Sequence, residues 1–435
     1  MPPALLTDQY LNKYSEKEAQ HLAEWVQECR PDIESEHILV IPSCAEKENL
    51  PTLLNSAALA AAHAQTSLLV IVVVNHRRSA PCAIKKNNKE TLSAWQQLSA
   101  GEPIAKESFR GFLGGWQAIQ LLFVNRAEKG IEFPEKQGVG LARKIGCDCA
   151  YYLWRLGIIS SQYACTSDGD AKLPLDYFKT KEWKEETDAA VLYDFRHIAT
   201  AKTNKFERLA MNQYEKYLNY YSKKLDEAGS PYSFHSIGST ISFSFNAYAK
   251  VRGFPKKEAG EDFYFLNKLR KIGPISIRKG EPILLAGRAS TRVPFGTGRA
   301  IITISNDLES GRSYEVYHPN IFGVLKIILR ASENYCKHLD TQVFQKECSK
   351  QLDFHKYQFR DKGKDLSFSW DELNIVLDKI KIRHFLSKLN AVAKKSSQRS
   401  QHFFIWFDGF KTIKLIHELK NSYFPSLPIE TIIKN

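Results

Sequence analysis

Two carboxylates stand one residue apart at the end of an apolar run, in Asp168-Gly169-Asp170 of the segment YACTSDGDAKLPLD (163–176). The apolar run predicts a buried strand, and ligands bind beyond the C-terminal strand ends of open parallel sheets. Two carboxylates at this spacing can hold Mg²⁺ or Mn²⁺ and leave positions open for phosphate oxygens. A solvated acidic turn is the alternative, whereas the remaining acids of a calcium-binding EF-hand loop are missing.

A second acidic pair, Glu261-Asp262, opens the segment GEDFYFLNKLRKIG (260–273), which the spacing of its apolar residues predicts to be a helix. A helix start favours acids through its dipole and its free N–H groups, so a capping pair is one interpretation. A carboxylate that accepts a proton during a reaction is the other.

Two further segments carry groups that suit an anion or a small polar ligand. In RASTRVPFGTGRA (288–300), Arg288 and Arg292 lie four residues apart, and the backbone N–H groups around Gly296 and Thr297 can face an anion. We expect a diphosphate-binding or lid segment there, with a basic surface loop as the alternative. In HSIGST (235–240), small residues around a glycine allow a ligand to approach closely. The three residues of interest there are His235, which could equally be a structural histidine, Gly238 and Ser239.

The elements that must position these residues alternate between strands and helices, which predicts an α/β fold with a mostly parallel sheet flanked by helices. Strands are expected at 38–41, 68–74, 116–124, 161–167, 189–195 and 239–245, and helices at 8–30, 50–62, 138–157, 205–227 and 260–273. Residues 76–115 are polar and are expected to form a long excursion. The pattern beyond residue 300 is mostly helical. We therefore expect an N-terminal helical lead-in (1–36), an α/β domain (37–300) and a C-terminal helical region (301–435).

Composition points to a folded protein with an anionic partner. The 435 residues are 43% hydrophobic and carry a net charge of +13. The N-terminus lacks the pattern of a secretion signal, and the eight cysteines are scattered singly, as is typical of reduced thiols. The expected location is the cytoplasm. A basic-aromatic nucleic-acid motif is missing, so nucleic acid is not the expected partner.

Three motifs, taken together and in order, resemble family 2 glycosyltransferases over about residues 37–300. IPSCAEKENLPTLL is similar to the family's first strand, loop and helix (I-P-x-x-N-E-x-x-x-L), and TSDGDAKLPLDYF to its D-x-D strand end. RGFPKKEAGEDFYFLNKLRKIG is similar to its G-G-F…E-D…L…G segment. The resemblance implies the Rossmann-like GT-A fold and an inverting, metal-dependent transfer of a sugar to an acceptor hydroxyl. The implied donor is a nucleotide-diphospho-sugar, with UDP the expected nucleotide.

The resemblance also implies roles for single residues. Pro42, Ser43, Cys44 and Glu46 would border the nucleoside pocket, although simple packing is an equal alternative for Cys44. Asn75 stands where the family usually has an aspartate that contacts the base. Arg143, with Lys144, would lie near the nucleotide, unless both belong to a solvated helix face. Asp168 would contact ribose or the metal, Asp170 would bind Mg²⁺ or Mn²⁺, and Asp262, beside Glu261, would be the general base. Arg288, Arg292, Gly296 and Thr297 would bind donor phosphate, and His235, Gly238 and Ser239 the acceptor or sugar.

The segment 288–300 departs from the better-known members, which often carry a His or a Q-x-x-R-W motif at this stage. It resembles a less characterised bacterial branch, so the third metal ligand is not defined and the acceptor stays open among carbohydrate, lipid-linked and small molecules.

The alternative functions are a non-catalytic glycan- or nucleotide-binding protein on the same scaffold and a nucleotidyltransferase. For QHFFIWFDGFKTIKLIHELK (401–420) the alternatives are a helical cap on the catalytic domain and a helix that docks on a partner or on the inner face of the membrane. The spacing of its apolar residues favours packing.

Overall fold

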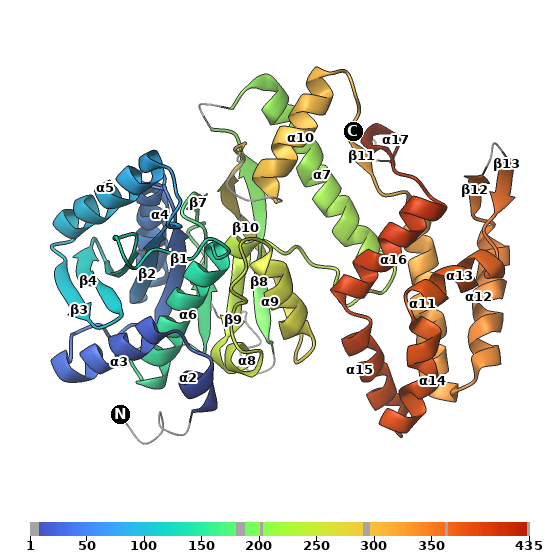
Figure 1. The fold of residues 1–435 in the computed structure, drawn as a ribbon, viewed down its shortest axis with the longest axis horizontal. Coiled ribbons are helices and arrows are strands. Elements are labelled where there is room, and N and C mark those ends of the chain that lie inside the picture. The colour runs from blue at the N-terminus through green and yellow to red at the C-terminus, as the bar shows by residue number, and fades with distance from the viewer. Residues whose placement is uncertain (1–7, 180–187, 201–202, 290–295, 362–363, 433–435) are drawn as a thin grey trace. The chain divides into compact units, whose positions relative to one another are not determined.

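The computed structural model describes residues 8–179, 188–200, 203–289, 296–361 and 364–432, which form two compact units. The first contains residues 1–204 and 236–301, and the second contains residues 205–235 and 302–435 (Figure 1). The units are not the linear ranges expected from the sequence. The first 36 residues belong to the α/β unit, and residues 205–235 belong with the C-terminal helices.

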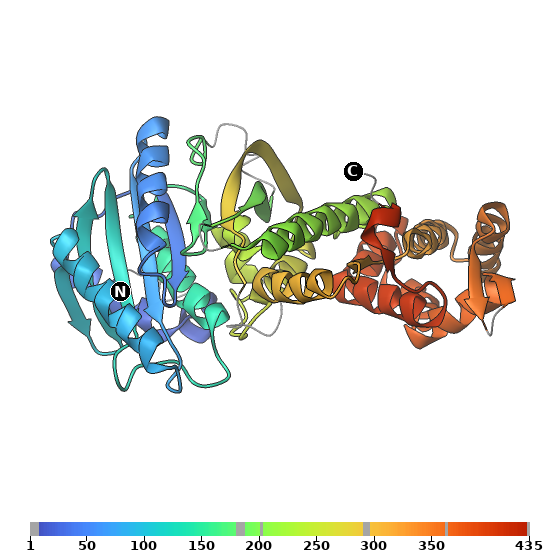
Figure 2. The same cartoon turned by 90° about the horizontal axis from the view of Figure 1, so that it is seen from above.

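The first unit is built on a ten-stranded sheet with the order β3-β4-β5-β2-β1-β6-β9-β8-β10-β7. The pairings give seven strands one direction, and β4, β9 and β7 run against them. The fold class predicted from the sequence, an α/β fold with a mostly parallel sheet flanked by helices, is confirmed (Figures 1 and 2). The bounds are β1 His37–Ser43, β2 Leu68–Asn75, β3 Glu102–Lys106, β4 Phe109–Trp116, β5 Ile119–Arg126, β6 Tyr163–Thr166, β7 Ala171–Lys172, β8 Ala190–Ile198, β9 Ile241–Ser244 and β10 Ile275–Ala286.

The central strands are apolar along their whole length because helices cover both of their faces. Every residue of β1 and β2 is buried. Leu39 and Ile41 of β1 belong to one core with α4, whereas a Cβ on Gly146 of α6 would meet Val40 at 2.4 Å. Alternate side chains of β1 therefore face α4 and α6, and Gly146 lets α6 approach the sheet closely. The helices of this unit are α2 Gln9–Lys13, α3 Lys17–Cys29, α4 Leu50–Ala64, α5 Cys82–Leu98, α6 Val139–Arg155, α8 Phe245–Lys250, α9 Glu261–Arg270 and the 3₁₀ turn η1 Gly238–Thr240.

The excursion expected over 76–115 is wrong, because this segment contains the 17-residue helix α5 and the edge strands β3 and β4. Only three α5 side chains are fully buried, those of Asn88, Thr91 and Trp95, so its apolar stripe is narrow. Trp95 packs in the same core as Phe112 and Phe123 of the sheet. The helix covers the α4 face of the sheet despite its polar composition.

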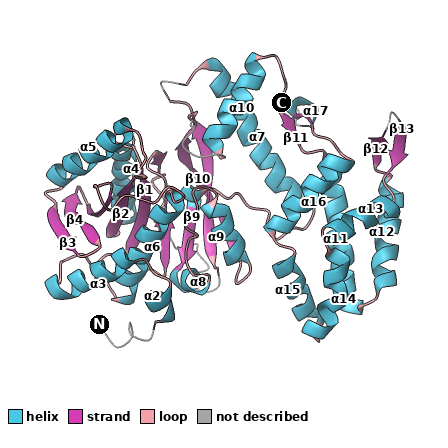
Figure 3. Ribbon diagram, in the orientation of Figure 1, coloured by secondary structure: helices cyan, strands magenta, loops and turns pink. Residues whose placement is uncertain are grey.

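The second unit is almost entirely helical within the described residues (Figure 3). Its core surrounds α11, and Phe403, Phe407 and Ile416 of the C-terminal segment are buried in it. No described helix is long and apolar enough to span a bilayer. The remaining elements are α7 Lys205–Glu227, α11 Pro319–His338, α12 Thr341–His355, α13 Trp370–Lys379, α14 Ile382–Val392, α15 Ser396–Trp406, α16 Gly409–Ser422, α17 Ile429–Ile432, the strand pairs β11 Glu315–Val316 with β14 Leu427–Pro428 and β12 Gln358–Asp361 with β13 Lys364–Ser367, and α10 Thr297–Glu309, which begins in the first unit.

Candidate functional site

The site lies in the first unit, at the C-terminal ends of β1 and β6, and the buried guanidinium of Arg143 is its central group. Arg143, on the second turn of α6, is 2% exposed. Its Nη2 donates to Asp168 Oδ1 at 2.7 Å and its Nε to Glu261 Oε1 at 3.1 Å. One side chain therefore joins the two acidic pairs predicted from the sequence, and its interpretation as part of a solvated helix face is wrong.

Two further hydrogen bonds fix the Arg143 guanidinium in place. Its Nη1 donates to Thr166 Oγ1 at 2.6 Å and to the Gly238 carbonyl at 3.2 Å. Burial alone would lower the pKa of Arg143, but the charges of Asp168 and Glu261 raise it above its ordinary value. The guanidinium is permanently charged and can hold both carboxylates in fixed positions.

Gly238 is required by this close approach. A Cβ at this position would lie 2.3 Å from Arg143 Nη2. The next residue, Ser239, donates its hydroxyl to Asp168 Oδ2. Both predicted residues of η1 therefore contact the Arg143–Asp168 pair. His235 is assigned to the second unit, where burial lowers its pKa from the ordinary histidine value.

Asp262 has the protonation behaviour of a base that works near neutral pH. Burial and the adjacent charge of Glu261 raise the pKa of Asp262 to about 7. The backbone N–H of Phe263 donates to its Oδ1 at 2.7 Å, which opposes this rise. Burial also raises the pKa of Glu261, against the lowering effect of Arg143. Glu261 is 3% exposed whereas Asp262 is only half-buried, so Asp262 is the member of the pair that can meet a ligand.

A second charged cluster lies beside the first and consists of Glu46, Asp170 and Arg288. Arg288 Nη2 lies 2.5 Å from Glu46 Oε1 and 2.9 Å from Asp170 Oδ2. The sheet brings these residues together, because Ala171 of β7 pairs with Leu285 of β10. Asp170 directly precedes Ala171, and Arg288 follows shortly after Leu285. Glu46 is close to the same strand end, since a Cβ on Gly169 would meet its Cγ at 2.9 Å.

The carboxylates of this second cluster fit a divalent cation by their chemistry. Oxygens of Glu46 and Asp170 converge on one positively charged nitrogen, and carboxylate oxygens are the ligands that Mg²⁺ and Mn²⁺ prefer. Asp168, the other ligand implied by the resemblance, uses its oxygens to accept from Arg143 and Ser239. No group of three or more His, Cys, Asp or Glu residues able to hold a metal occurs in the part of the chain that the structure describes.

The loops after β1 and β2 are held by Asn88 of α5, which the sequence analysis did not single out. Its Oδ1 accepts from the Ala45 backbone at 2.8 Å, and its Nδ2 donates to the Asn75 carbonyl at 2.9 Å. Asn88 is fully buried, and its helical spacing with Thr91 and Trp95 is the sequence signal that could have identified it. Thr166, the other residue missed, is a strand hydroxyl without a distinctive pattern.

The remaining site residues predicted from the sequence lie at the same edge of the sheet, except Arg292. Pro42 is buried within β1, and Cys44 follows that strand half-buried and is not in a disulfide. Asn75, buried at the end of β2, donates its amide to the Ser43 and Val73 carbonyls, so these N–H groups support the loop. Gly296 precedes α10 with φ 107°, and the Thr297 hydroxyl lies 3.5 Å from His197 Nε2. Arg292 lies outside the described residues.

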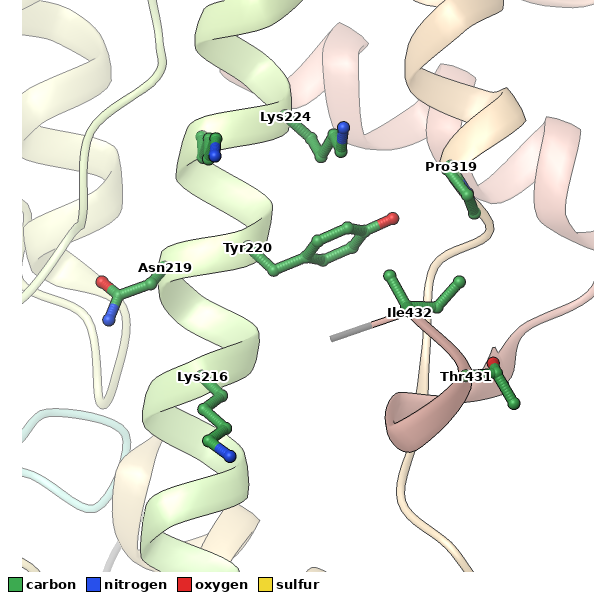
Figure 4. Close-up of a pocket in the computed structure, with 8 residues that line it drawn as sticks. Lys216, Asn219, Tyr220, Lys224, Pro319, Thr431 and Ile432 are labelled. Carbon is green, nitrogen blue, oxygen red and sulfur yellow. The ribbon is translucent and has the colours of Figure 1, made fainter. Parts of the chain in front are cut away.

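A pocket of about 670 Å³ lies apart from these residues, within the second unit. Lys216, Tyr220 and Lys224 of α7 line one side of it, and Pro319, Thr431 and Ile432 line the other (Figure 4). None of the residues predicted from the sequence lines this pocket.

No protein-family model and no curated protein matches the chain. Among solved structures, it is similar to S. aureus TarS 1–349 in complex with UDP-GlcNAc, with 9% identity, a TM-score of 0.36 and coverage of 73% of this chain and 79% of that chain. It is also similar to the mannosyltransferase PcManGT from Pyrobaculum calidifontis in complex with GDP-Man and Mn²⁺, with 13% identity, a TM-score of 0.35 and coverage of 93% of both chains. These similarities are too low to establish a shared family or activity.

Proposed function

We propose that the first unit is an inverting glycosyltransferase of the GT-A type that uses a nucleotide-diphospho-sugar, with UDP as the expected nucleotide. One observation supports the proposal most strongly. Buried Arg143 joins Asp168 of the D-G-D turn to Glu261 of the E-D pair, through contacts of 2.7 and 3.1 Å. A donor site and a base must be adjacent in a transferase, and nothing in a binding protein requires Asp262 to titrate near pH 7 beside them.

Asp262 has the role of general base in this proposal. Its carboxylate would take the proton of the acceptor hydroxyl as that oxygen attacks the anomeric carbon. A pKa of about 7 suits this task, because the group is substantially ionised at neutral pH and still accepts a proton readily. Arg143 acts through the carboxylates and is a positioning residue. A single attack from the face opposite the nucleotide inverts the anomeric centre.

The donor would lie against the loops after β1 and β6. Glu46, 4% exposed, would border the nucleoside, and Asp168 would contact the ribose. The first turn of α10, which begins at Thr297, would present backbone N–H groups to phosphate oxygens. Asp170 and Glu46 would hold a divalent cation, which supplies charge neutralisation for the departing diphosphate.

The acceptor class stays open among carbohydrate, lipid-linked and small molecules. The proposal places the enzyme in the cytoplasm, as the cysteine usage predicts. None of the eight cysteines, all of which lie in the described part of the chain, is in a disulfide. Phe403, Phe407 and Ile416 are buried in the core of the second unit, which supports a packing role for residues 401–420.

Calorimetric titration of UDP and GDP, with and without Mn²⁺, tests the donor site. We expect one of the two diphosphates to bind in a metal-dependent way, and Asp170→Asn to weaken that binding at least about tenfold, because a metal ligand loses its charge. Asp176→Asn is the control, since this carboxylate accepts from Arg278 at 3.1 Å elsewhere in the unit. Equal binding by wild type and Asp170→Asn would contradict the assignment of Asp170, and no binding of either nucleotide would contradict the proposed donor class.

A further inference from the structure

Arg288 contacts the two carboxylates of the proposed cation site with a single atom. Its Nη2 lies 2.5 Å from Glu46 Oε1 and 2.9 Å from Asp170 Oδ2. One unit of positive charge is thus placed between two carboxylates that come from different loops. A divalent cation bound by the same two oxygens would need the space of that nitrogen.

The two carboxylates are more buried than the guanidinium. The Glu46 side chain is 5% exposed, and its second oxygen, Oε2, accepts from Asn49 Nδ2 at 2.7 Å. Asp170 directly precedes β7 and is 19% exposed. The Arg288 side chain is 30% exposed and follows the end of β10, so it is the member of the cluster that can change position.

We propose, on the basis of the function proposed above, that Arg288 occupies the cation position in the nucleotide-free protein and moves to the donor diphosphate when a divalent cation enters. The charges favour this exchange. A divalent cation carries twice the charge of the guanidinium, so it would neutralise both carboxylates and release Arg288 with its full charge. A free guanidinium fork matches the geometry of phosphate oxygens. Cation and diphosphate binding are therefore coupled through one side chain.

Mn²⁺ binding without nucleotide measures the exchange directly, by the loss of the electron paramagnetic resonance signal of the free ion. We expect Arg288→Ala to bind Mn²⁺ about tenfold more tightly than wild type, because a competing positive charge is removed. Adding Glu46→Gln to Arg288→Ala should abolish the gain. Arg155→Ala is the matched control. Arg155 is 29% exposed, pairs with Asp8 at 3.3 Å and lies 12 residues further along α6 than Arg143.

Nucleotide titrations at saturating Mn²⁺ test the second half of the exchange. Arg288→Ala should weaken UDP binding about tenfold and leave UMP binding nearly unchanged, because only the diphosphate offers the second phosphate to the guanidinium. GDP and GMP replace them if the protein prefers guanine. Arg288→Gln, which keeps a polar side chain without the charge, should behave like Arg288→Ala and replaces it if that variant does not fold.

The inference is overturned if Arg288→Ala binds Mn²⁺ no more tightly than wild type and Arg155→Ala do. It is also overturned if neither wild type nor Arg288→Ala binds Mn²⁺. The same results leave the proposed function standing if UDP or GDP still binds wild type. Failure of every nucleotide to bind wild type, with a normal Mn²⁺ gain in Arg288→Ala, would instead overturn the function and retain the cation exchange.

Discussion

At the scale of single residues, the proposed mechanism depends on the ionisation of Asp262. Burial and the charge of Glu261 raise the pKa of Asp262 to about 7, so the carboxylate is protonated, and cannot act as a base, at lower pH. We expect kcat/KM for donor consumption to rise with pH up to about 7 and to be level above it. Glu261→Gln removes the neighbouring charge and should move this rise to lower pH. A pH profile that is the same in wild type and Glu261→Gln would contradict the coupling.

The contact between Gly238 and Arg143 gives a second prediction at this scale. Gly238→Ala places a methyl group 2.3 Å from Nη2 of a fully buried guanidinium that has four hydrogen-bond partners. We expect a loss of about 1–3 kcal/mol in the free energy of unfolding, measured by urea denaturation, together with weaker donor binding. In the control Gly115→Ala, the added Cβ has no atom within 4 Å. Equal stability of the two variants would show that the Arg143 network is loosely packed.

At the scale of elements, α5 is expected to hold the loops of the donor site. Asn88→Ala removes the acceptor of the Ala45 N–H and the donor to the Asn75 carbonyl, and all of these groups lie at the ends of β1 and β2. We expect a loss of about 1–3 kcal/mol in the free energy of unfolding, because buried polar groups lose their partners, and a several-fold weaker nucleotide affinity. Asn55→Ala, on the exposed face of α4, removes only the surface acceptor of the Trp116 and Gln117 side chains, so it should leave nucleotide affinity unchanged and reduce stability much less. Unchanged nucleotide affinity in Asn88→Ala would contradict the role of α5.

The elements that the sequence predicts well are those with a strand buried along its whole length or a regularly spaced buried helix face. The apolar runs of β1 and β2 and the spacing of α4, α6 and α9 identify them, since two covered faces require apolar side chains throughout. Strand β4 was missed because its glycines weaken the strand pattern. One of them, Gly111, is needed where a Cβ would lie 1.9 Å from the Phe123 carbonyl oxygen.

The site could be predicted in part for a similar reason. The D-G-D and E-D pairs are local patterns, so the sequence displays them. The burial of Arg143 depends on four partner groups from three separate segments, and the meeting of Asp170 with Arg288 depends on the two-residue strand β7. Such long-range contacts leave no periodic pattern in the sequence.

At the scale of the whole molecule, the two units interrupt each other along the chain. In sequence, helix α7 falls between strands of the first unit, but it packs with α11, and Tyr220 donates its hydroxyl to the carbonyl of Tyr317, just before α11, at 2.8 Å. Truncation after residue 300 would therefore expose the apolar face of α7, including Tyr220 and Leu225. We expect residues 1–300 to aggregate, as measured by size-exclusion chromatography.

The matched control for this truncation is residues 1–300 with 205–235 replaced by a short glycine-serine linker. This variant lacks the exposed face and should be more soluble than the simple truncation. A monomeric and stable 1–300 protein that retains α7 would contradict the division of the chain into these two units.

Proton NMR of the nucleotide-sugar donor, incubated with Mn²⁺ and a mixture of glycan acceptors, follows the proposed sugar transfer itself. We predict that wild type releases the nucleotide diphosphate and forms a product of opposite anomeric configuration. Asp262→Asn should bind the donor equally well and react about 10²–10⁴ times more slowly, because the general base is missing. Donor consumption at the same rate by both proteins, or a product that retains the anomeric configuration, would contradict the proposed enzyme.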